Sequence, residues 1–153
     1  RHEMPDVTRK DFDRLVAANI NHQFFPAQAV ADDMRALGGG SIINFGSISW
    51  LMKGRGYPVY QACKAGVIGL TRSLARDLGK QNIRVNTIMP GWVMTERQIK
   101  LWVKPESAAE IDAAQCLPGR VMSEDIAAMA LFLAADDSRM CTAQDYVVDA
   151  GWT

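Results

Sequence analysis

Apolar residues recur at helical spacing through the first quarter of the chain. From about Arg9 to Leu37 they fall three or four positions apart, which indicates one long amphipathic helix. The preceding stretch Asp6–Thr8 offers polar side chains that suit a helix cap. Pro26 lies inside this helix and disturbs the turn before it, so we expect a bend just beyond Asn19. The positions that carry the period are Phe12, Leu15, Val16, Ile20 and Phe24.

Shorter apolar runs then predict two buried strands with a helix between them. Gly38–Gly40 stops the first helix and turns the chain into a strand at Ile42–Phe45. A helix is expected from Pro58 to Leu78, because proline suits a first helical position and Gly79 is a typical stop. Ile83–Met89 is almost continuously apolar, as a parallel strand covered on both faces is.

The rest of the chain completes an alternation of helices and strands. Residues 96–120 have no clean period and predict a short helical lid. Ser123 is expected to cap a helix that runs to about Ala135, and Tyr146–Asp149 reads as a last strand. This alternation predicts an α/β fold with a layered parallel sheet and right-handed crossovers.

Composition narrows the function classes. Lys and Arg together number 17, as do Asp and Glu, so no basic field attracts a nucleic acid. No apolar run approaches the ~18 residues that suggest a membrane span. His2 and His22 have no partner at ligand spacing, so we expect no metal. The odd number of cysteines favours reduced thiols in a cytoplasmic protein; they are Cys63, Cys116 and Cys141.

Ser47, Tyr60 and Lys64 are the candidate chemistry. Tyr60 and Lys64 are four positions apart, so they share one face of the helix that begins near Pro58. The ammonium of Lys64 and the positive end of the helix dipole both favour the phenolate, which makes Tyr60 a plausible general acid or base. Ser47 follows a strand, where it could hold the reacting oxygen. The Tyr–Lys spacing and the serine after a strand each occur often by chance, but together they indicate a hydroxyl or carbonyl redox site.

These residues lie in a set of motifs that resembles the short-chain dehydrogenase/reductase family over nearly the whole chain. The motifs are Gly38–Ser47, Tyr60–Lys64, Ile83–Gly91, Thr95, Leu131–Ala135 and Asp149–Trp152. The resemblance implies that Ser47 orients the substrate oxygen, Tyr60 transfers the proton, and Lys64 assists Tyr60 and holds the nicotinamide ribose. Asn19, by its place in Val16–Ile20, would complete a water-linked proton relay. The implied contacts to NAD or NADP are Tyr60, Lys64, Pro90, Gly91, the backbone of Val93 and the hydroxyl of Thr95.

One part of the family pattern is missing. The family begins with a strand and a Gly-rich turn that binds pyrophosphate, whereas Gly38–Gly40 precedes a strand. We interpret residues 1–153 as a single partial domain, the catalytic half, in which ~90 to 100 residues before Arg1 are absent. The implied fold is the C-terminal part of a Rossmann-like, doubly wound parallel sheet in three α/β/α layers, without the N-terminal cofactor-binding strands. The residue that separates NAD from NADP is among those absent.

Two expectations follow from this interpretation. The 153 residues alone should bind nicotinamide cofactors poorly and turn over nothing measurable. The strand Ile42–Phe45 should lie at an unpaired sheet edge, a site of pairing between chains. The family commonly pairs its long helix and its Tyr60 helix between subunits, so a homo-dimer or homo-tetramer is expected.

The substrate is the most open question. The lid and the ending Asp149–Trp152 look like the branch of the family that oxidises aldoses at C1 to lactones. Trp50, Trp92, Gln98 and Trp102 could then contact a sugar, although each tryptophan could equally be a core or interface aromatic. The alternatives are the same chemistry on a 3-oxoacyl, steroid or polyol substrate, and a non-catalytic structural or dimerising fragment.

Overall fold

The central sheet has three parallel strands in the order β1-β2-β3, which confirms the predicted α/β parallel fold. The computed structural model describes residues 3–153, except the side chain of Pro105. The strands are β1 (Gly40–Phe45), β2 (Ile83–Pro90) and β3 (Asp145–Val148). Each is within two residues of its predicted bounds.

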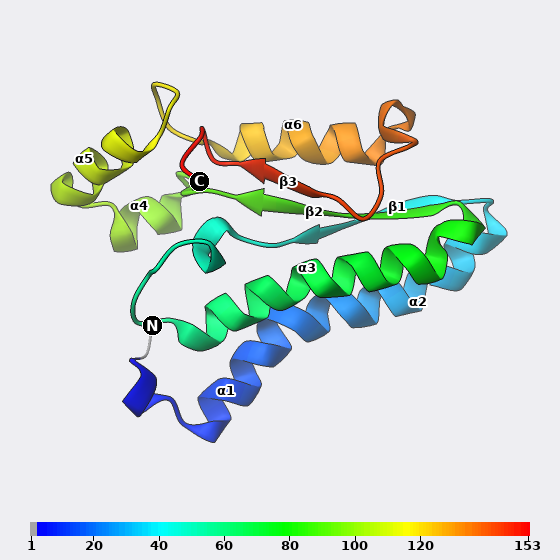
Figure 1. Ribbon diagram of the computed structural model, residues 1–153, viewed down its shortest axis with the longest axis horizontal. Helices are drawn as coiled ribbons and strands as arrows, with labels where there is room; N and C mark the ends of the chain where they lie inside the picture. Colours follow the sequence, from blue (N-terminus) through cyan, green and yellow to red (C-terminus); the bar gives the residue numbers. More distant parts are fainter. Residues whose placement is uncertain (1–2) are drawn as a thin grey trace.

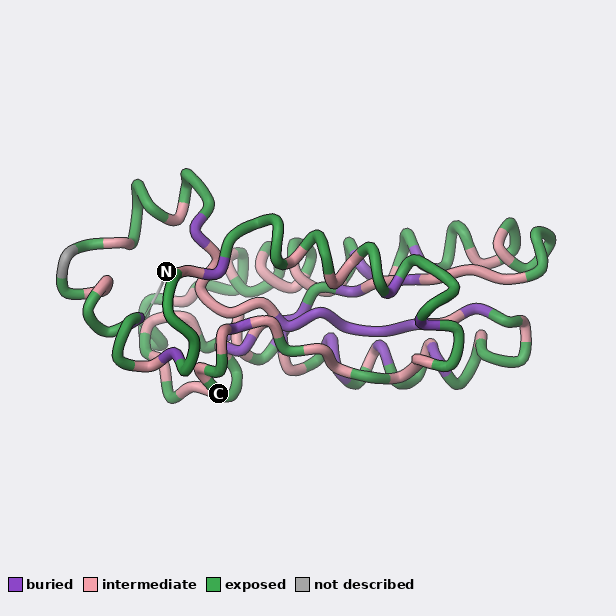
Figure 2. The backbone as a smooth tube through the Cα atoms, turned by 90° about the horizontal axis from the view of Figure 1, so that it is seen from above, coloured by how far each residue is buried: buried purple, intermediate pink, exposed green. Residues whose placement is uncertain are grey.

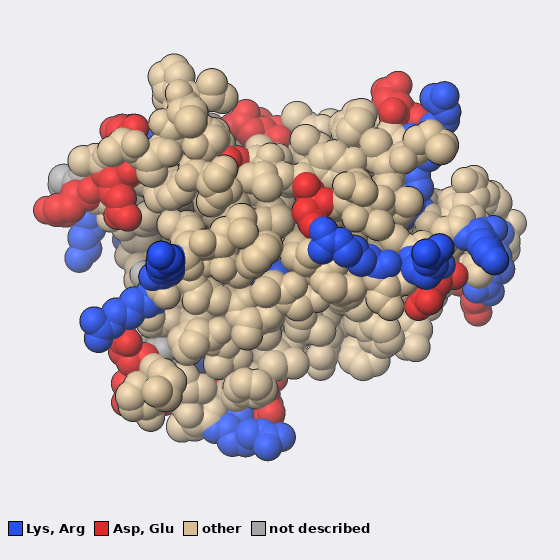
Figure 3. All heavy atoms as spheres, in the orientation of Figure 1, with Lys and Arg blue, Asp and Glu red and all other residues tan. Residues whose placement is uncertain are grey.

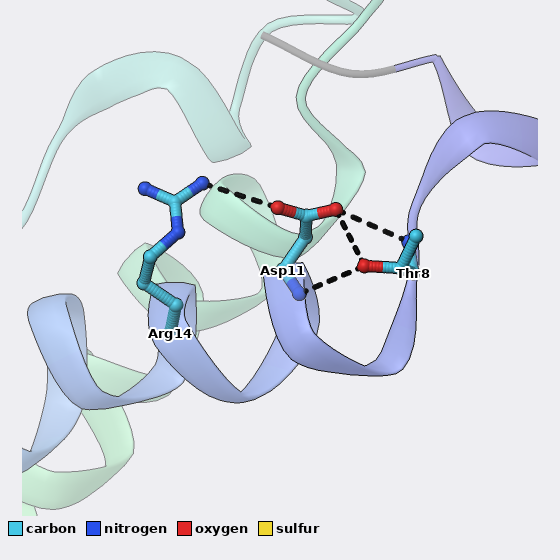
Figure 4. A network of polar contacts seen from close by, with 3 residues as sticks. All are labelled: Thr8, Asp11 and Arg14. Carbon is cyan, nitrogen blue, oxygen red and sulfur yellow. Dashed lines mark hydrogen bonds and ion pairs between the residues drawn. The ribbon is translucent and has the colours of Figure 1, made fainter.

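A capping network starts the first helix, α1 (Arg9–Val16). The backbone N–H of Asp11 donates to the Thr8 hydroxyl at 3.1 Å, and the Asp11 carboxylate accepts from the Thr8 backbone and hydroxyl (Figure 4). Arg14 adds an ion pair to the same carboxylate at 3.3 Å. The predicted cap is confirmed, and its reciprocal bonds satisfy two donors that a helix start leaves free.

The predicted long helix is continuous but not uniform. Between α1 and α2 (His22–Ala36) the chain forms a π-helix at Ala17–Asn21, and the two helices run at an angle to one another (Figure 1). Asn19 lies inside the π-helix, close to the bend predicted from Pro26. Such π turns widen a helix locally and occur often at functional sites.

Helix α3 (Pro58–Leu78) has the predicted bounds and stops at Gly79 as predicted, although Gly79 does not take the left-handed conformation of a typical glycine stop. Gly79 keeps a right-handed φ of −60° and opens a 3-10 turn that ends at Gln81. Asn82 takes the left-handed conformation instead, with φ of 60°. Asparagine tolerates this region better than most residues, so the reversal needs no glycine at this point.

Three layers result, with α2 and α3 on one face of the sheet and α6 (Ser123–Ala134) on the other (Figure 1). β2 lies in the middle, and its burial is visible as the longest buried stretch of Figure 2. The core side chains of this strand, 0 to 2% exposed, include Ile83, Val85, Ile88 and Met89. The sequence of this strand is almost continuously apolar because helices cover both of its faces.

The lid segment contains two helices, α4 (Glu96–Trp102) and α5 (Pro105–Ala114), in agreement with the helical lid that was predicted. The expectation that Ser123 caps α6 is wrong, because Ser123 is already helical and Met122 is the cap. The Asp125 carboxylate closes this end by accepting the Met122 N–H at 2.7 Å.

Figure 3 shows basic and acidic side chains mixed among uncharged ones on the face it draws, with a row of basic side chains from near its centre to the right. No helix within residues 3–153 combines the length and apolarity that crossing a bilayer requires.

Candidate active site

A cavity of about 460 Å³ lies beyond the carboxyl ends of β1 and β2. Open parallel sheets bind ligands at this end of their strands. Predicted site residues from four separate segments meet here. Those that line the cavity are Ser47, Tyr60, Gly91, Trp92, Gln98 and Trp102.

The loop after β1 presents two serines to this cavity. Ser47 is extended, and its hydroxyl accepts the Ser49 backbone N–H at 3.1 Å, which fixes the first turn of the loop. Gln61 reaches over from α3 and donates to the carbonyls of Ser49, at 2.7 Å, and Met52, at 3.1 Å. The Ser49 hydroxyl is buried without a hydrogen-bond partner among the described residues, although Ser49 lines the cavity. A buried polar atom of this kind is suited to a ligand or water.

Tyr60 and Lys64 lie on one face of α3, as the spacing predicted. The Lys64 Nζ is 5.7 Å from the centre of the Tyr60 ring. It donates to the Phe45 carbonyl at the end of β1, at 2.9 Å. Lys64 is only 8% exposed, and this burial lowers its pKa, while the adjacent Cys63 opposes the shift more weakly. The ammonium is therefore held in a fixed place behind the tyrosine.

Gln23 connects Asn19 to Lys64, a role the sequence did not suggest. Its side chain donates to the Asn19 carbonyl at 2.9 Å and to the Phe45 carbonyl at 3.3 Å, and accepts the Phe45 N–H at 2.8 Å. The Asn19 amide itself donates to the Leu15 carbonyl at 2.8 Å within the helix. Asn19 and Lys64 thus share a network through one backbone carbonyl. A glutamine on the apolar face, one turn after Asn19, was the only available signal.

A family model matches the whole sequence. The model is described as enoyl-(acyl carrier protein) reductase and covers residues 1–153. The chain belongs to the short-chain dehydrogenase/reductase family.

Two family members from bacteria are similar over almost the entire chain. D-xylose 1-dehydrogenase of Caulobacter vibrioides is 49% identical over 152 residues, which are 99% of this chain and 61% of that protein. A probable galactose dehydrogenase of Rhizobium meliloti is 46% identical over 151 residues, covering 99% of this chain and 59% of that protein. The chain therefore spans about three fifths of the length of these relatives.

A solved family structure has the same arrangement of elements. It is a 4-hydroxyisoleucine dehydrogenase complexed with NADH, 31% identical, with a TM-score of 0.93. The match covers 99% of this chain and 63% of that one. The Rossmann-like architecture expected from the sequence is in agreement with this match.

The remaining residues expected from the short-chain dehydrogenase/reductase pattern are not among the described residues that line the cavity. Thr95 caps α4, where its hydroxyl accepts the Gln98 N–H at 3.2 Å and keeps its own proton to donate. The Val93 N–H donates to the Gly91 carbonyl at 3.1 Å. Trp50 ends a 3-10 turn and is 37% exposed. The other predicted residues outside the lining are Asn19, Lys64 and Pro90.

Several residues that line the cavity were absent from the predicted set, and Trp152 is one of them. Trp152 follows β3, lines the cavity, and has its ring centre 6.1 Å from that of Trp92. The sequence offered it only as part of the ending motif. Trp152 reaches the cavity because a turn after β3 brings the chain back to it. The pattern of apolar residues in the sequence does not predict this turn.

The sequence predicted no metal site. Within residues 3–153, no three His, Cys, Asp or Glu side chains gather as metal ligands would. His22 lies at a separate groove beside β1. His2 lies outside the described residues.

Proposed function

We propose that this protein is a nicotinamide-dependent dehydrogenase that oxidises an aldose at C1 to a lactone. The observation that carries the proposal is the meeting of Ser47 and Tyr60 on one cavity, with the Lys64 ammonium behind the phenol ring. The substrate class rests on the identities of 49% and 46% to a D-xylose 1-dehydrogenase and a probable galactose dehydrogenase.

In the proposed reaction, the C1 hydroxyl of the sugar lies between the hydroxyls of Ser47 and Tyr60. Ser47 donates a hydrogen bond that orients the reacting oxygen, and Tyr60 accepts its proton as general base. The C1–H bond breaks with its electron pair, and the C1–O bond becomes the lactone carbonyl. The nicotinamide, when bound, supplies the acceptor for that hydride. Tyr60 accepts the proton as a phenolate and becomes neutral, and Lys64 stabilises the negative charge that the phenolate carries before the transfer.

The residues beside the cavity fit a nicotinamide cofactor. Within residues 3–153, the Thr95 hydroxyl proton has no acceptor, the Ser49 hydroxyl is buried without a partner, and the Lys64 ammonium donates to one carbonyl. We propose that Tyr60 and Lys64 hold the ribose. The loop contacts to the nicotinamide would be Pro90, Gly91, the Val93 backbone and Thr95. The proposed cofactor is NAD or NADP, and residues 1–153 would form the catalytic half of one domain.

For the sugar, we propose contacts with Trp92, Trp102 and Gln98. The two indoles provide flat apolar surface for the C–H face of a sugar ring, and the Gln98 amide can pair with ring hydroxyls. A cavity of about 460 Å³ lies within the range of small-molecule sites. Trp50 is left out of this set because the cavity does not reach it.

A substrate screen tests the proposal. The protein in its native length is assayed with pentoses and hexoses, using NAD and NADP in turn, alongside 3-oxoacyl, steroid and polyol substrates. We expect turnover of an aldose, and a loss of roughly 100-fold or more in kcat for Tyr60→Phe. Turnover of another class alone would assign the site to that class. Absence of any dehydrogenase activity would favour a structural or dimerising module.

A further inference from the structure

The segment after β3 is folded around one buried carboxylate. Asp149 is 5% exposed, and its two oxygens accept three hydrogen bonds. The donors are the Gly151 N–H at 2.8 Å and both the N–H and the hydroxyl of Thr153, each at 2.9 Å. A buried carboxylate with three donors is well satisfied, so it holds this turn in one conformation.

The same turn is bound to the end of the lid. The Ala150 carbonyl accepts the N–H groups of Cys116, at 2.9 Å, and Leu117, at 3.1 Å. Gly151 has φ of +80°, and a Cβ added there would come within 2.8 Å of the Cys116 Cβ. Neither the turn nor the chain that leaves α5 can move without the other.

A third contact joins this turn to the loop after β2. Gly91 donates its N–H to the Val148 carbonyl at 2.9 Å, and a Cβ on Gly91 would come within 2.6 Å of the Asp149 Cβ. The backbone of Asp149 therefore lies against the loop that carries Trp92. Two of the three indoles that line the cavity, Trp92 and Trp152, lie next to this contact in the sequence.

The fixed turn delivers Trp152 to the cavity. One part of its ring packs on the apolar cluster of Ile48, Ile68 and Met89 beneath the site. Its ring centre is 6.1 Å from that of Trp92, with the planes 33° apart, and both rings line the cavity. Two tilted indoles at this spacing form one aromatic surface of the cavity that Ser47 and Tyr60 also line.

We propose that Trp152 is a specificity-determining residue that stacks on the C–H face of the sugar ring, and that Asp149 is the positioning residue that holds it there. This inference rests on the proposed function. Aromatic rings offer large, rigid contact area, so removing one weakens substrate binding more than the chemical step. Trp152 contacts neither the proton nor the hydride, so its loss acts through KM.

The test uses three substitutions of Trp152 in the protein of native length. Trp152→Ala is expected to lower kcat/KM for D-xylose roughly 10- to 100-fold, through KM, with kcat changed only a few-fold. Trp152→Leu fills the space above the apolar cluster without a flat ring and should lose as much. Trp152→Phe should recover most of the loss. Phe25→Ala, an exposed aromatic on α2, is the control for truncation alone.

A substrate ratio separates specificity from folding. Trp152→Ala enlarges the cavity, so D-galactose, which is longer than D-xylose by one carbon, should gain in relative kcat/KM. A smaller folded fraction would lower both sugars equally and leave the ratio unchanged. Asp149→Asn retains volume but places an amide N–H₂ where donors now point, so it should shift the ratio in the same direction.

The outcomes are distinct for the two proposals. Turnover of aldoses by the wild-type protein, with KM and the sugar ratio unchanged in Trp152→Ala and Trp152→Leu, overturns this inference alone. Wild-type protein that turns over no aldose overturns the proposed function and this inference with it. A changed ratio in Trp152→Ala with none in Asp149→Asn overturns the positioning role of Asp149.

Discussion

Lys64 is a lysine whose charged side chain is buried away from water. Its ammonium is buried, and within residues 3–153 no carboxylate pairs with it; the Phe45 carbonyl is its hydrogen-bond acceptor. Burying such a charge costs free energy unless the site compensates it. A residue kept in this way, beside a tyrosine on a cavity, is a strong candidate for function.

Replacing Lys64 by methionine should separate activity from stability. We expect kcat to fall roughly 100-fold or more, because Tyr60 loses the charge that assists proton transfer. The pKa of Lys64 is lowered from 10.5 by burial, so between the folded value and 10.5 the unfolded chain binds more protons. The wild-type free energy of unfolding therefore rises with pH through this window. At lower pH, the folded protein bears the full free-energy cost of burying the charged Lys64 ammonium.

Urea unfolding of wild type and Lys64→Met at several pH values, from about 7 to about 10, checks this sign. The stability difference should favour the variant most at neutral pH and should shift toward the wild type as the pH rises. Lys53→Met, at an exposed lysine, is the control and should show no such trend. A difference independent of pH would contradict the account of Lys64.

Gln23 should contribute to both stability and activity through its hydrogen bonds to Phe45. Gln23→Leu leaves the Phe45 N–H without its acceptor and should cost roughly 1–3 kcal/mol in free energy of unfolding. The exposed Gln28→Leu on the same helix should change stability by less than about 0.5 kcal/mol. Thermal or urea unfolding measures both. Because Gln23 also links Asn19 to the carbonyl that holds Lys64, kcat should fall in Gln23→Leu alone.

The elements themselves were largely predictable from the sequence, and the exceptions have physical causes. The bounds of α3 and of the central strand were predicted from Pro58 and from the pattern of apolar residues. This pattern is informative because a buried helix face or strand needs apolar residues along its whole length. The cap of α6 was misplaced by one residue, because the Asp125 carboxylate does the work that was assigned to Ser123. Gln23 and Trp152 were missed because their roles arise from contacts between elements distant in sequence.

The loop after β2 approaches the turn after β3 closely at Gly91. Gly91→Ala would place a Cβ 2.6 Å from the Asp149 Cβ and 2.7 Å from its Cα, and backbone there cannot yield cheaply. We expect a loss of about 1–3 kcal/mol in stability, with a raised KM because the wall of Trp92 and Trp152 shifts. Gly69→Ala in α3 meets nothing within 4 Å and should instead stabilise by about 0.4–1 kcal/mol. Equal effects of the two substitutions on stability would show that the close approach is unimportant.

The whole molecule is a three-stranded sheet whose outer β1 edge pairs with no strand among residues 3–153. Phe45, at the end of this edge, is 41% exposed, and apolar side chains elsewhere are exposed as well, such as Leu131 at 71%. Open edges and apolar surface favour association, so a homo-dimer or homo-tetramer stays a prediction. The proposed catalytic groups lie at one end of this sheet and are held by contacts within the described chain.

Cofactor binding by the 153 residues alone tests how far this part suffices. Within residues 3–153, no Gly-rich turn leads from a strand directly into a helix, the arrangement that binds pyrophosphate. We therefore expect the chain, shown to be folded by circular dichroism, to bind NADH with a Kd on the order of 1 mM or weaker. Reduced nicotinamide mononucleotide, which lacks the adenosine half, should bind equally weakly, because the proposed contacts involve only the nicotinamide and its ribose. Quenching of tryptophan fluorescence measures both ligands, since three indoles line the cavity. Micromolar binding of NADH, with a clear preference over the mononucleotide, would show that the adenosine half also finds its contacts within these residues.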